Sequence, residues 1–381
     1  MEKMIKEGKI FCKIYSDKKI SRELPVFYNP AMKTNRDVTV ELLRVQKRNN
    51  LQIADVLAAS GIRSIRMIKE LPAKKIKTVL INDCSENAVK LIKENLKINK
   101  LNLGKNNKIT ISCNDANKAL LDGNGFDYID IDPFGSPNPF IDSAVKRLAR
   151  DGILAVTATD TSALAGTFEN ACRRKYWAKP MRNELMHEIG IRILIRKVQL
   201  IASQYEKALT PLLSYSTQHY MRVFFVCEKG KEKADAINNL HKYVLYCTNC
   251  MQIQTDNLNK IECCNKQMQY AGPCWVGELN QKKMVQHILD NVMRNKMYKE
   301  EKELQKLLQA IKEESCVSTV GFYDIHMLVK RNNLKNIPKF DFIIKACKQR
   351  GFDAVRTHFD EYAIKSNISA KMLISILKEL N

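Results

Sequence analysis

The segment FDYIDIDPFGSP, residues 126–137, joins an apolar, β-rich run to a polar turn. The pattern predicts a strand over 126–133 and a helix from about Asn138 to Leu148. The same alternation extends in both directions along the chain. It predicts strands at 53–59, 77–83, 108–115 and 152–159, and helices ending near Leu71, over 85–100 and over 183–205. Alternating strands and helices favour an α/β fold with a parallel, doubly wound sheet.

Two further strands are predicted near 210–217 and 220–228. They are too close for a crossover helix, so at least one of them must run antiparallel. This arrangement resembles a class I, Rossmann-like AdoMet-dependent methyltransferase domain. The charged segment KGKEKADAINN (229–239) predicts a boundary between a first domain with an N-terminal extension (1–230) and a smaller α+β domain (231–381). The tail from Val320 to Leu380 has the proportions of a winged helix.

The chain of 381 residues carries a formal charge of +22, which favours a polyanionic partner such as a nucleic acid. A solvated basic surface is the alternative. No apolar stretch approaches the roughly 20 residues that span a bilayer, and the charged N-terminus lacks the apolar core of a signal peptide. We therefore expect a cytoplasmic protein without membrane association, and no obligate protein partner. Twelve cysteines in such a protein are not expected to form a disulfide framework.

Small or polar residues follow the first three predicted strands, where ligands of open α/β sheets bind. Gly61 in ASGIR (59–63) would allow a ligand to approach the backbone closely. Asp83 could accept hydrogen bonds from two ribose hydroxyls, although a surface residue beside a helix capped by Ser85 is the alternative. Asp115 and the backbone of Ala116 could contact an adenine. The absence of a GxGxxG motif argues against NAD and fits a cofactor without pyrophosphate, such as S-adenosylmethionine (AdoMet).

The fourth strand ends in Asp132-Pro133-Phe134, the most specific string in the chain. An exocyclic amine is a poor nucleophile because its lone pair is delocalised into the base. The Asp132 carboxylate and the Pro133 carbonyl could accept its two hydrogens and direct the lone pair, while Phe134 could stack on an extruded base. An ordinary strand-to-helix turn is the alternative. Asp130 shares a side of the strand with Asp132 and is a secondary candidate.

The sequence resembles the tRNA (guanine-26, N2)-dimethyltransferase family along nearly its whole length. The resemblance is carried by VFYNPAMKTNRDVTVELL (26–43), DVLAASGIRSIR (55–66), NDCSENAV (82–89), IDIDPFGSPNPFIDSA (129–144), VTATDTSALAG (156–166), HEIGIRILI (187–195) and AGPCWVGEL (271–279).

The resemblance implies methylation of N2 of guanine 26 in tRNA, once or twice, by an AdoMet-dependent enzyme. It places catalysis on Asp132 with Pro133 and Phe134, and it gives Arg36 and Arg63 a geometry suited to the methionyl carboxylate. The full set of expected cofactor contacts is Phe27, Arg36, Asp55, Gly61, Arg63, Asp83, Asp115 and Ala116. An amino-methyltransferase for another RNA or for DNA and a catalytically silent tRNA-binding protein are the alternatives.

The stretch 160–182 interleaves basic and aromatic residues, which suits phosphate contact and base stacking. We predict RNA contacts at Arg173, Arg174, Lys175 and Trp177, and we expect the C-terminal domain (231–381) to bind the tRNA as well. An irregular solvated loop is the alternative.

A cysteine-rich stretch, 247–264, has the composition of a structural zinc module. Cys247 and Cys250 have the spacing of a zinc knuckle, and Cys263 and Cys264 follow about a dozen residues later. Because adjacent ligands are geometrically awkward, Cys274 is kept as a reserve for Cys263. Four reduced thiols without metal are the alternative.

Overall fold

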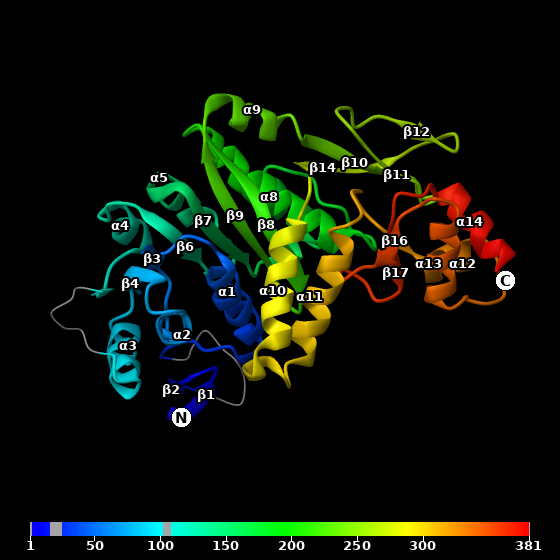
Figure 1. Ribbon diagram of the computed structural model, residues 1–381. Helices are drawn as coiled ribbons and strands as arrows, with labels where there is room; N and C mark the ends of the chain where they lie inside the picture. The colour runs from blue at the N-terminus through cyan, green and yellow to red at the C-terminus, as the bar shows by residue number, and fades with distance from the viewer. Residues whose placement is uncertain (1, 16–24, 102–107, 381) are drawn as a thin grey trace.

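The structure is a computed structural model that describes residues 2–15, 25–101 and 108–380. A seven-stranded sheet forms the centre of the molecule (Figure 1). Across the sheet its strands are β5 (Ile109–Ser112), β4 (Ile76–Asn82), β3 (Leu51–Asp55), β6 (Phe126–Ile131), β7 (Leu148–Ala158), β9 (Tyr220–Lys229) and β8 (Lys207–Thr217). The strands are parallel except β9, which pairs antiparallel with both β7 and β8. The doubly wound sheet with an antiparallel strand in its terminal pair is thus confirmed.

Helices cover both faces of this sheet. One face packs against α4 (Ala116–Leu121), α5 (Asn138–Arg147) and α8 (Met186–Ser203). The other packs against α1 (Lys33–Val45), α2 (Ile62–Glu70), α3 (Glu86–Ile98), α10 (Lys282–Arg294) and α11 (Lys302–Glu314). Strand alternation explains the two cores: Ile129 and Ile131 belong to the first, and Tyr128, which precedes Ile129, belongs to the second.

The N-terminal part adds a hairpin to the second face. It consists of β1 (Glu2–Glu7) and β2 (Ile10–Tyr15), which pair antiparallel. Strand β2 packs on α2 and α3, and the short helix η1 (Pro30–Met32) leads into α1. Figure 1 shows the hairpin below α2, with the N-terminus at its tip.

The C-terminal part contains two small sheets and a hairpin. Helix α9 (Lys231–Asn238) is followed by a three-stranded sheet, whose strands are β10 (His241–Tyr246), β11 (Ile253–Asp256) and β14 (Gln269–Trp275), with β10 in the centre. The hairpin consists of β12 (Glu262–Cys263) and β13 (Lys266–Gln267). Beyond α10, η2 (Lys296–Tyr298) and α11, the chain forms β15 (Tyr323–Asp324), α12 (Ile325–Arg331), α13 (Phe340–Gln349), β16 (Ala354–Arg356), β17 (Ala363–Ser366) and α14 (Ala370–Glu379). Helices α12 and α13 are followed by the hairpin of β16 and β17, and β15 pairs with β17 to complete a three-stranded sheet. This order agrees with the winged-helix proportions predicted for this tail.

The predicted boundary at 230 coincides with the end of the central sheet, because β9 ends at Lys229. Hydrophobic packing crosses it, however. The core on the α8 face continues without interruption into the C-terminal part, through residues such as Trp275, Phe322 and Leu373. The division into domains 1–230 and 231–381 therefore stays a prediction.

Three local expectations differ from the structure. The first strand, expected over 53–59, ends at Asp55, because Ala59 and Gly61 adopt positive φ values of 47° and 73° and turn the chain. Residues 160–182 are not an irregular loop: they contain α6 (Thr161–Leu164) and α7 (Glu169–Tyr176). Helix α4 was not anticipated, and the strand expected over 108–115 spans only Ile109–Ser112. Within the described ranges, no helix is long and apolar enough to cross a membrane.

Candidate active site

A cavity of about 630 Å³ lies where β3, β4 and β6 end. The carboxyl ends of parallel strands meet at one edge of the sheet, so residues distant in sequence converge there. Eight of the predicted site residues line the cavity: Phe27, Arg36, Asp55, Arg63, Asp83, Asp132, Pro133 and Phe134. Gly61 lies between two lining residues, Ser60 and Ile62.

Asp115 and Ala116 do not line the cavity. Asp115 is exposed and caps α4, where its Oδ1 accepts hydrogen bonds from the backbone of Asn117 (2.9 Å) and Lys118 (3.2 Å). Ala116 is buried as the first residue of that helix. The structure therefore leaves these two predicted contacts beyond the cavity that holds the others.

Asp83 fixes the loop that follows β3. Its carboxylate accepts hydrogen bonds from the backbone N–H of Ala59 (2.8 Å) and of Ser85 (3.0 Å). Ser85 caps α3 through the N–H of Ala88, as the alternative reading of this turn expected. Gly61 is required in this loop, because its φ is +73° and an added Cβ would lie 3.1 Å from Ile92.

The turn after β6 is held from the end of β7. Gly135, with a φ of +84°, donates its N–H to the Thr159 hydroxyl (2.6 Å) and accepts from the Thr159 N–H (3.0 Å). Pro133 is buried, whereas Phe134 is 47% exposed. The ring of Phe27 meets Phe134 edge-on, with centroids 4.1 Å apart, so the two predicted aromatic residues are in contact.

Asp132 is hydrogen-bonded to Arg63, which is itself buried. Arg63 also donates to Asn35 (2.7 Å) and Thr39 (3.0 Å) and lies 3.5 Å from the Asp130 carboxylate. These partners fix the Arg63 guanidinium between α1 and the end of β6.

Asp130, the secondary candidate, has a structural partner that sequence reasoning missed. Arg222 donates two hydrogen bonds to it, at 3.0 and 2.7 Å. Although burial raises the pKa of Asp130, Arg222 and Arg63 hold that pKa below its usual value. An arginine within the apolar run YMRVFFV was the available signal, since a buried charge requires a partner.

Asp55 lies beside the same group. Burial and the neighbouring Asp130 carboxylate raise the pKa of Asp55 to about 7, in spite of Arg63. The Ser64 hydroxyl donates to Asp55 at 2.7 Å. Asp55 thus titrates near neutral pH at the floor of the cavity.

Arg36 is held by Glu7, a residue that the sequence did not single out. Its Nε and Nη2 donate to the two Glu7 oxygens at 2.7 and 2.6 Å, and its guanidinium lies 5.3 Å from the ring of Tyr28. Burial raises the pKa of Glu7, but Arg36 and Arg66 outweigh it and lower that pKa to about 2. The N-terminal hairpin therefore sets the position of a cavity arginine.

Helix α7 adjoins the turn after β6. The Tyr176 hydroxyl lies 3.1 Å from Ser136 Oγ and donates to Asp160 at 2.6 Å, and Asn138 donates to the Lys175 carbonyl at 2.8 Å. The four predicted RNA contacts, Arg173, Arg174, Lys175 and Trp177, are all exposed. Arg173 pairs with Glu169 (2.7 Å) and Lys175 with Asp160 (3.1 Å).

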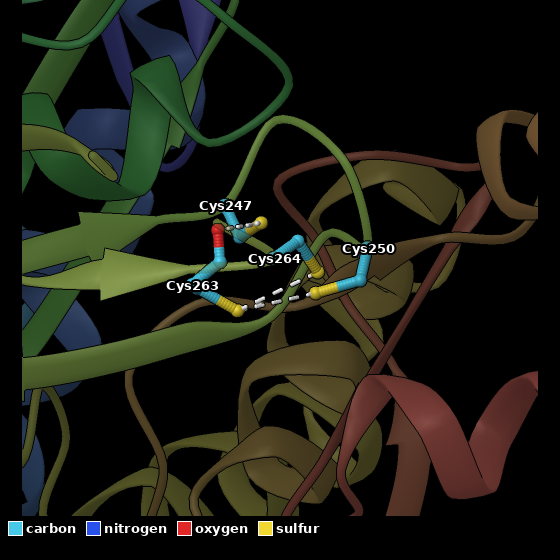
Figure 2. Close-up of side chains that lie close together, drawn as sticks. All are labelled: Cys247, Cys250, Cys263 and Cys264. Atoms are coloured by element: carbon cyan, nitrogen blue, oxygen red, sulfur yellow. Dashed lines mark hydrogen bonds between the residues drawn. The ribbon is translucent and has the colours of Figure 1, made fainter. Parts of the chain in front are cut away.

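Four cysteines converge in the C-terminal part (Figure 2). The sulfur atoms of Cys247, Cys250, Cys263 and Cys264 all lie within 4.8 Å of one another. The Cys250–Cys263 and Cys263–Cys264 separations are 3.6 and 3.9 Å. Tetrahedral zinc with Zn–S bonds of about 2.3 Å requires sulfurs about 3.8 Å apart, so these thiols fit such an ion.

Adjacent residues can both join this group because Cys264 adopts a φ of +53°. Cys274, the reserve ligand, lies fully buried on β14 and is not part of the group. The described geometry thus favours Cys263 over Cys274.

Comparison with known proteins identifies the family. The profile of the N2,N2-dimethylguanosine tRNA methyltransferase family matches residues 7–378. The chain belongs to this family. The resemblance inferred from the motifs is therefore confirmed.

Relatives and a solved structure agree over nearly the full length. A tRNA (guanine(26)-N(2)/guanine(27)-N(2))-dimethyltransferase of Aquifex aeolicus is 39% identical over 95% of this chain and 92% of its own. A tRNA (guanine(26)-N(2))-dimethyltransferase of Methanobrevibacter smithii is 36% identical over 100% and 98%. Trm1 from Pyrococcus horikoshii, solved with S-adenosyl-L-methionine, superposes with a TM-score of 0.87 at 32% identity, covering 98% of this chain and 99% of that one. The Rossmann-like methyltransferase fold is thus confirmed.

Proposed function

We propose that this protein transfers methyl groups from AdoMet to the exocyclic N2 of guanine 26 in tRNA, giving N2-methylguanosine and N2,N2-dimethylguanosine. One observation carries the proposal: Asp132-Pro133-Phe134 lines the same cavity as Arg36, Arg63 and Asp83. Amine-directing and cofactor-binding groups therefore face a common space. The names of the relatives support tRNA as the substrate and guanine 26 as the position.

The donor set of the cavity fits AdoMet. The cofactor supplies a methyl group on a positively charged sulfur. Arg36 and Arg63 would bind the methionyl carboxylate, and Asp83 would accept from the ribose hydroxyls. Gly61 would allow the cofactor to approach the backbone closely, and Asp55, which lines the same cavity, would also contact it.

Phe27 would pack beside the cofactor, and Asp115 with Ala116 would contact the adenine. Because Asp115 and Ala116 lie beyond the cavity, their role requires the adenine to extend towards the start of α4. Arg36 already binds Glu7, and Arg63 already binds Asp132. The methionyl carboxylate would therefore share each arginine with that partner or replace the partner.

The base would enter from the exposed side of Phe134. Asp132 and the Pro133 carbonyl would accept the two N2 hydrogens, which restores the lone pair and directs it at the methyl carbon. The N–C bond would form as the C–S bond of the cofactor breaks, and the proton that N2 loses would pass to the Asp132 carboxylate. Because Phe27 contacts Phe134, a stacking base must move Phe27 or lie against its ring.

The remaining predicted residues would hold the RNA and brace the C-terminal part. Arg173, Arg174, Lys175 and Trp177 flank the turn after β6 and would contact phosphates and bases. Cys247, Cys250, Cys263 and Cys264 would bind one structural zinc as thiolates, with no part in the chemistry. The protein would act on tRNA in the cytoplasm.

Transfer of tritium from labelled AdoMet to bulk tRNA tests the proposal, with ribosomal RNA and DNA assayed in parallel. Label in tRNA alone is the expected result. Label in DNA or ribosomal RNA would favour a different amino-methyltransferase. Binding of tRNA without any transfer would favour a silent tRNA-binding protein.

A further inference from the structure

We propose that Lys179, held over the ring of Tyr270, is a phosphate contact through which the cysteine-rich part of the chain joins the RNA-binding surface. The inference rests on the proposed function and extends it. It assigns one specific contact, where the chain after α7 meets β14, to the RNA-binding surface expected of residues 160–182 and of the C-terminal domain.

The two residues come from different parts of the chain but share a short β-bridge. Lys179 follows α7, and its backbone exchanges hydrogen bonds with Gly272 of β14, at 2.9 and 2.7 Å. The Lys179 ammonium lies 4.0 Å from the centroid of the Tyr270 ring. A cation over an aromatic face is attracted by the ring, so the flexible lysine is held in one place.

Tyr270 is itself fixed from two sides. Its ring meets Tyr243 of β10 edge-on, with centroids 5.7 Å apart. It also packs against the hydrophobic cluster of Leu245, Cys247 and Met268, which Cys250 and Cys263 border. Packing beside Cys247, Cys250 and Cys263 thus holds the Tyr270 ring in place, and the ring in turn holds the Lys179 ammonium.

The charge at Lys179 is not neutralised. Across residues 2–15, 25–101 and 108–380, no carboxylate lies within ion-pair distance of Lys179. Lys179 therefore lacks an internal counterion, and an RNA phosphate is the counterion that the substrate would bring.

A second lysine–tyrosine pair on the molecule provides a contrast. Lys146 lies 5.6 Å from the ring centroid of Tyr205. There, however, Asp142 pairs with Lys146 (2.7 Å) and accepts from Tyr205 (2.5 Å). That pair is neutralised internally and offers no net charge to RNA.

The junction also lies next to the catalytic turn. Tyr176, three residues before Lys179, contacts Ser136, which lines the cavity. A tRNA with its target base beside Phe134 therefore presents neighbouring phosphates in this direction.

The test measures tRNA affinity as a function of salt for four variants. Lys179→Gln should weaken binding about tenfold and lower the slope of log K against log salt by roughly 0.7–0.9, as expected for one lost phosphate contact. Lys179→Arg should restore most of both. Tyr270→Leu should behave like Lys179→Gln, whereas Tyr270→Phe keeps the aromatic face and should bind normally.

Lys146→Gln and Tyr205→Leu are the matched controls and should change neither affinity nor slope. AdoMet affinity and thermal unfolding, measured for every variant, should stay at wild-type values. A Lys179→Gln variant that binds tRNA with the wild-type slope would overturn the inference while leaving methylation by the wild type intact. A wild type that neither binds nor methylates tRNA would overturn the proposed function as well.

Discussion

Arg63 donates a hydrogen bond to the carboxylate of Asp132, and so links the cofactor side of the cavity to the base side. Asn35 and Thr39 hold the same guanidinium from α1. Asp132 is therefore oriented before any ligand arrives. A cofactor carboxylate that binds Arg63 would change the partner of Asp132, so the two binding events should be coupled.

Replacement of Asp132 tests its role in directing the amine. We expect Asp132→Ala to retain AdoMet binding and to lose roughly 10²–10⁴ in methyl-transfer rate, because a positioned acceptor is removed. Single-turnover transfer and calorimetric AdoMet binding measure the two quantities. Asp142→Asn, at a position on α5 that does not line the cavity, is the control. Activity above a tenth of wild type, or loss of AdoMet affinity alone, would refute the assignment.

Glu7 should make stability depend on pH in a defined window. Its folded pKa of about 2 lies below the usual 4.5, so its contribution is complete above pH 4.5 and is lost as the pH falls through 2. This shift corresponds to about 3 kcal/mol at neutral pH. We expect Glu7→Gln to lower the free energy of unfolding by about that amount at pH 7 and by less at pH 3.

Urea unfolding at the two pH values measures this difference. AdoMet affinity of Glu7→Gln should also fall, because Arg36 loses the carboxylate that orients it. Glu94→Gln, which removes one of the two carboxylate partners of Lys13 in β2, is the control. An equal destabilisation at pH 3 and pH 7 would exclude the ionised Glu7–Arg36 pair as its source.

The strand-end residues could be predicted because local pattern decides them. Asp83 and Asp132 each follow an apolar run, and parallel strands bring such ends together whatever the details of packing. The partners of buried charges could not be predicted in this way. Arg222 binds Asp130 across 92 residues and Glu7 binds Arg36 across 29, pairings that only the assembled fold creates.

Helix α7 shows a second limit of local pattern. An irregular loop was the alternative for residues 160–182, but Tyr176 of α7 is buried and hydrogen-bonded to Asp160 and Ser136. Tertiary contacts thus stabilise a helix that composition alone does not favour. For the cysteines, spacing predicted the group correctly, while the choice between Cys263 and Cys274 needed the backbone conformation at Cys264.

The cysteine group should contribute stability through metal. We expect about one zinc per chain, lost in Cys250→Ser together with the stability of the C-terminal part, because structural zinc contributes folding free energy directly. Elemental analysis and thermal unfolding measure the two effects. Cys316→Ser, at an exposed cysteine outside the group, is the control. Protein purified without chelator that contains no metal would end this proposal.

Helix α7 should contribute binding energy that does not depend on tRNA sequence. We expect Arg173→Ala combined with Arg174→Ala to weaken binding to all tRNAs about equally and to flatten the salt dependence, since phosphate contacts carry no sequence information. Lys231→Ala with Lys233→Ala, on α9, is the matched control. Normal binding by the double arginine variant would exclude α7 from the RNA surface.

The central claim is tested most directly by nucleoside mass spectrometry of one defined tRNA after incubation with the protein and AdoMet. The account predicts N2-methylguanosine followed by N2,N2-dimethylguanosine, mapped to position 26, and no product there in a tRNA that carries adenine at position 26. A guanine-27 substitution in the same tRNA shows whether that neighbour is a second target. An unmodified guanine 26 with AdoMet and tRNA both bound, or methylation of a different nucleoside, would contradict the account.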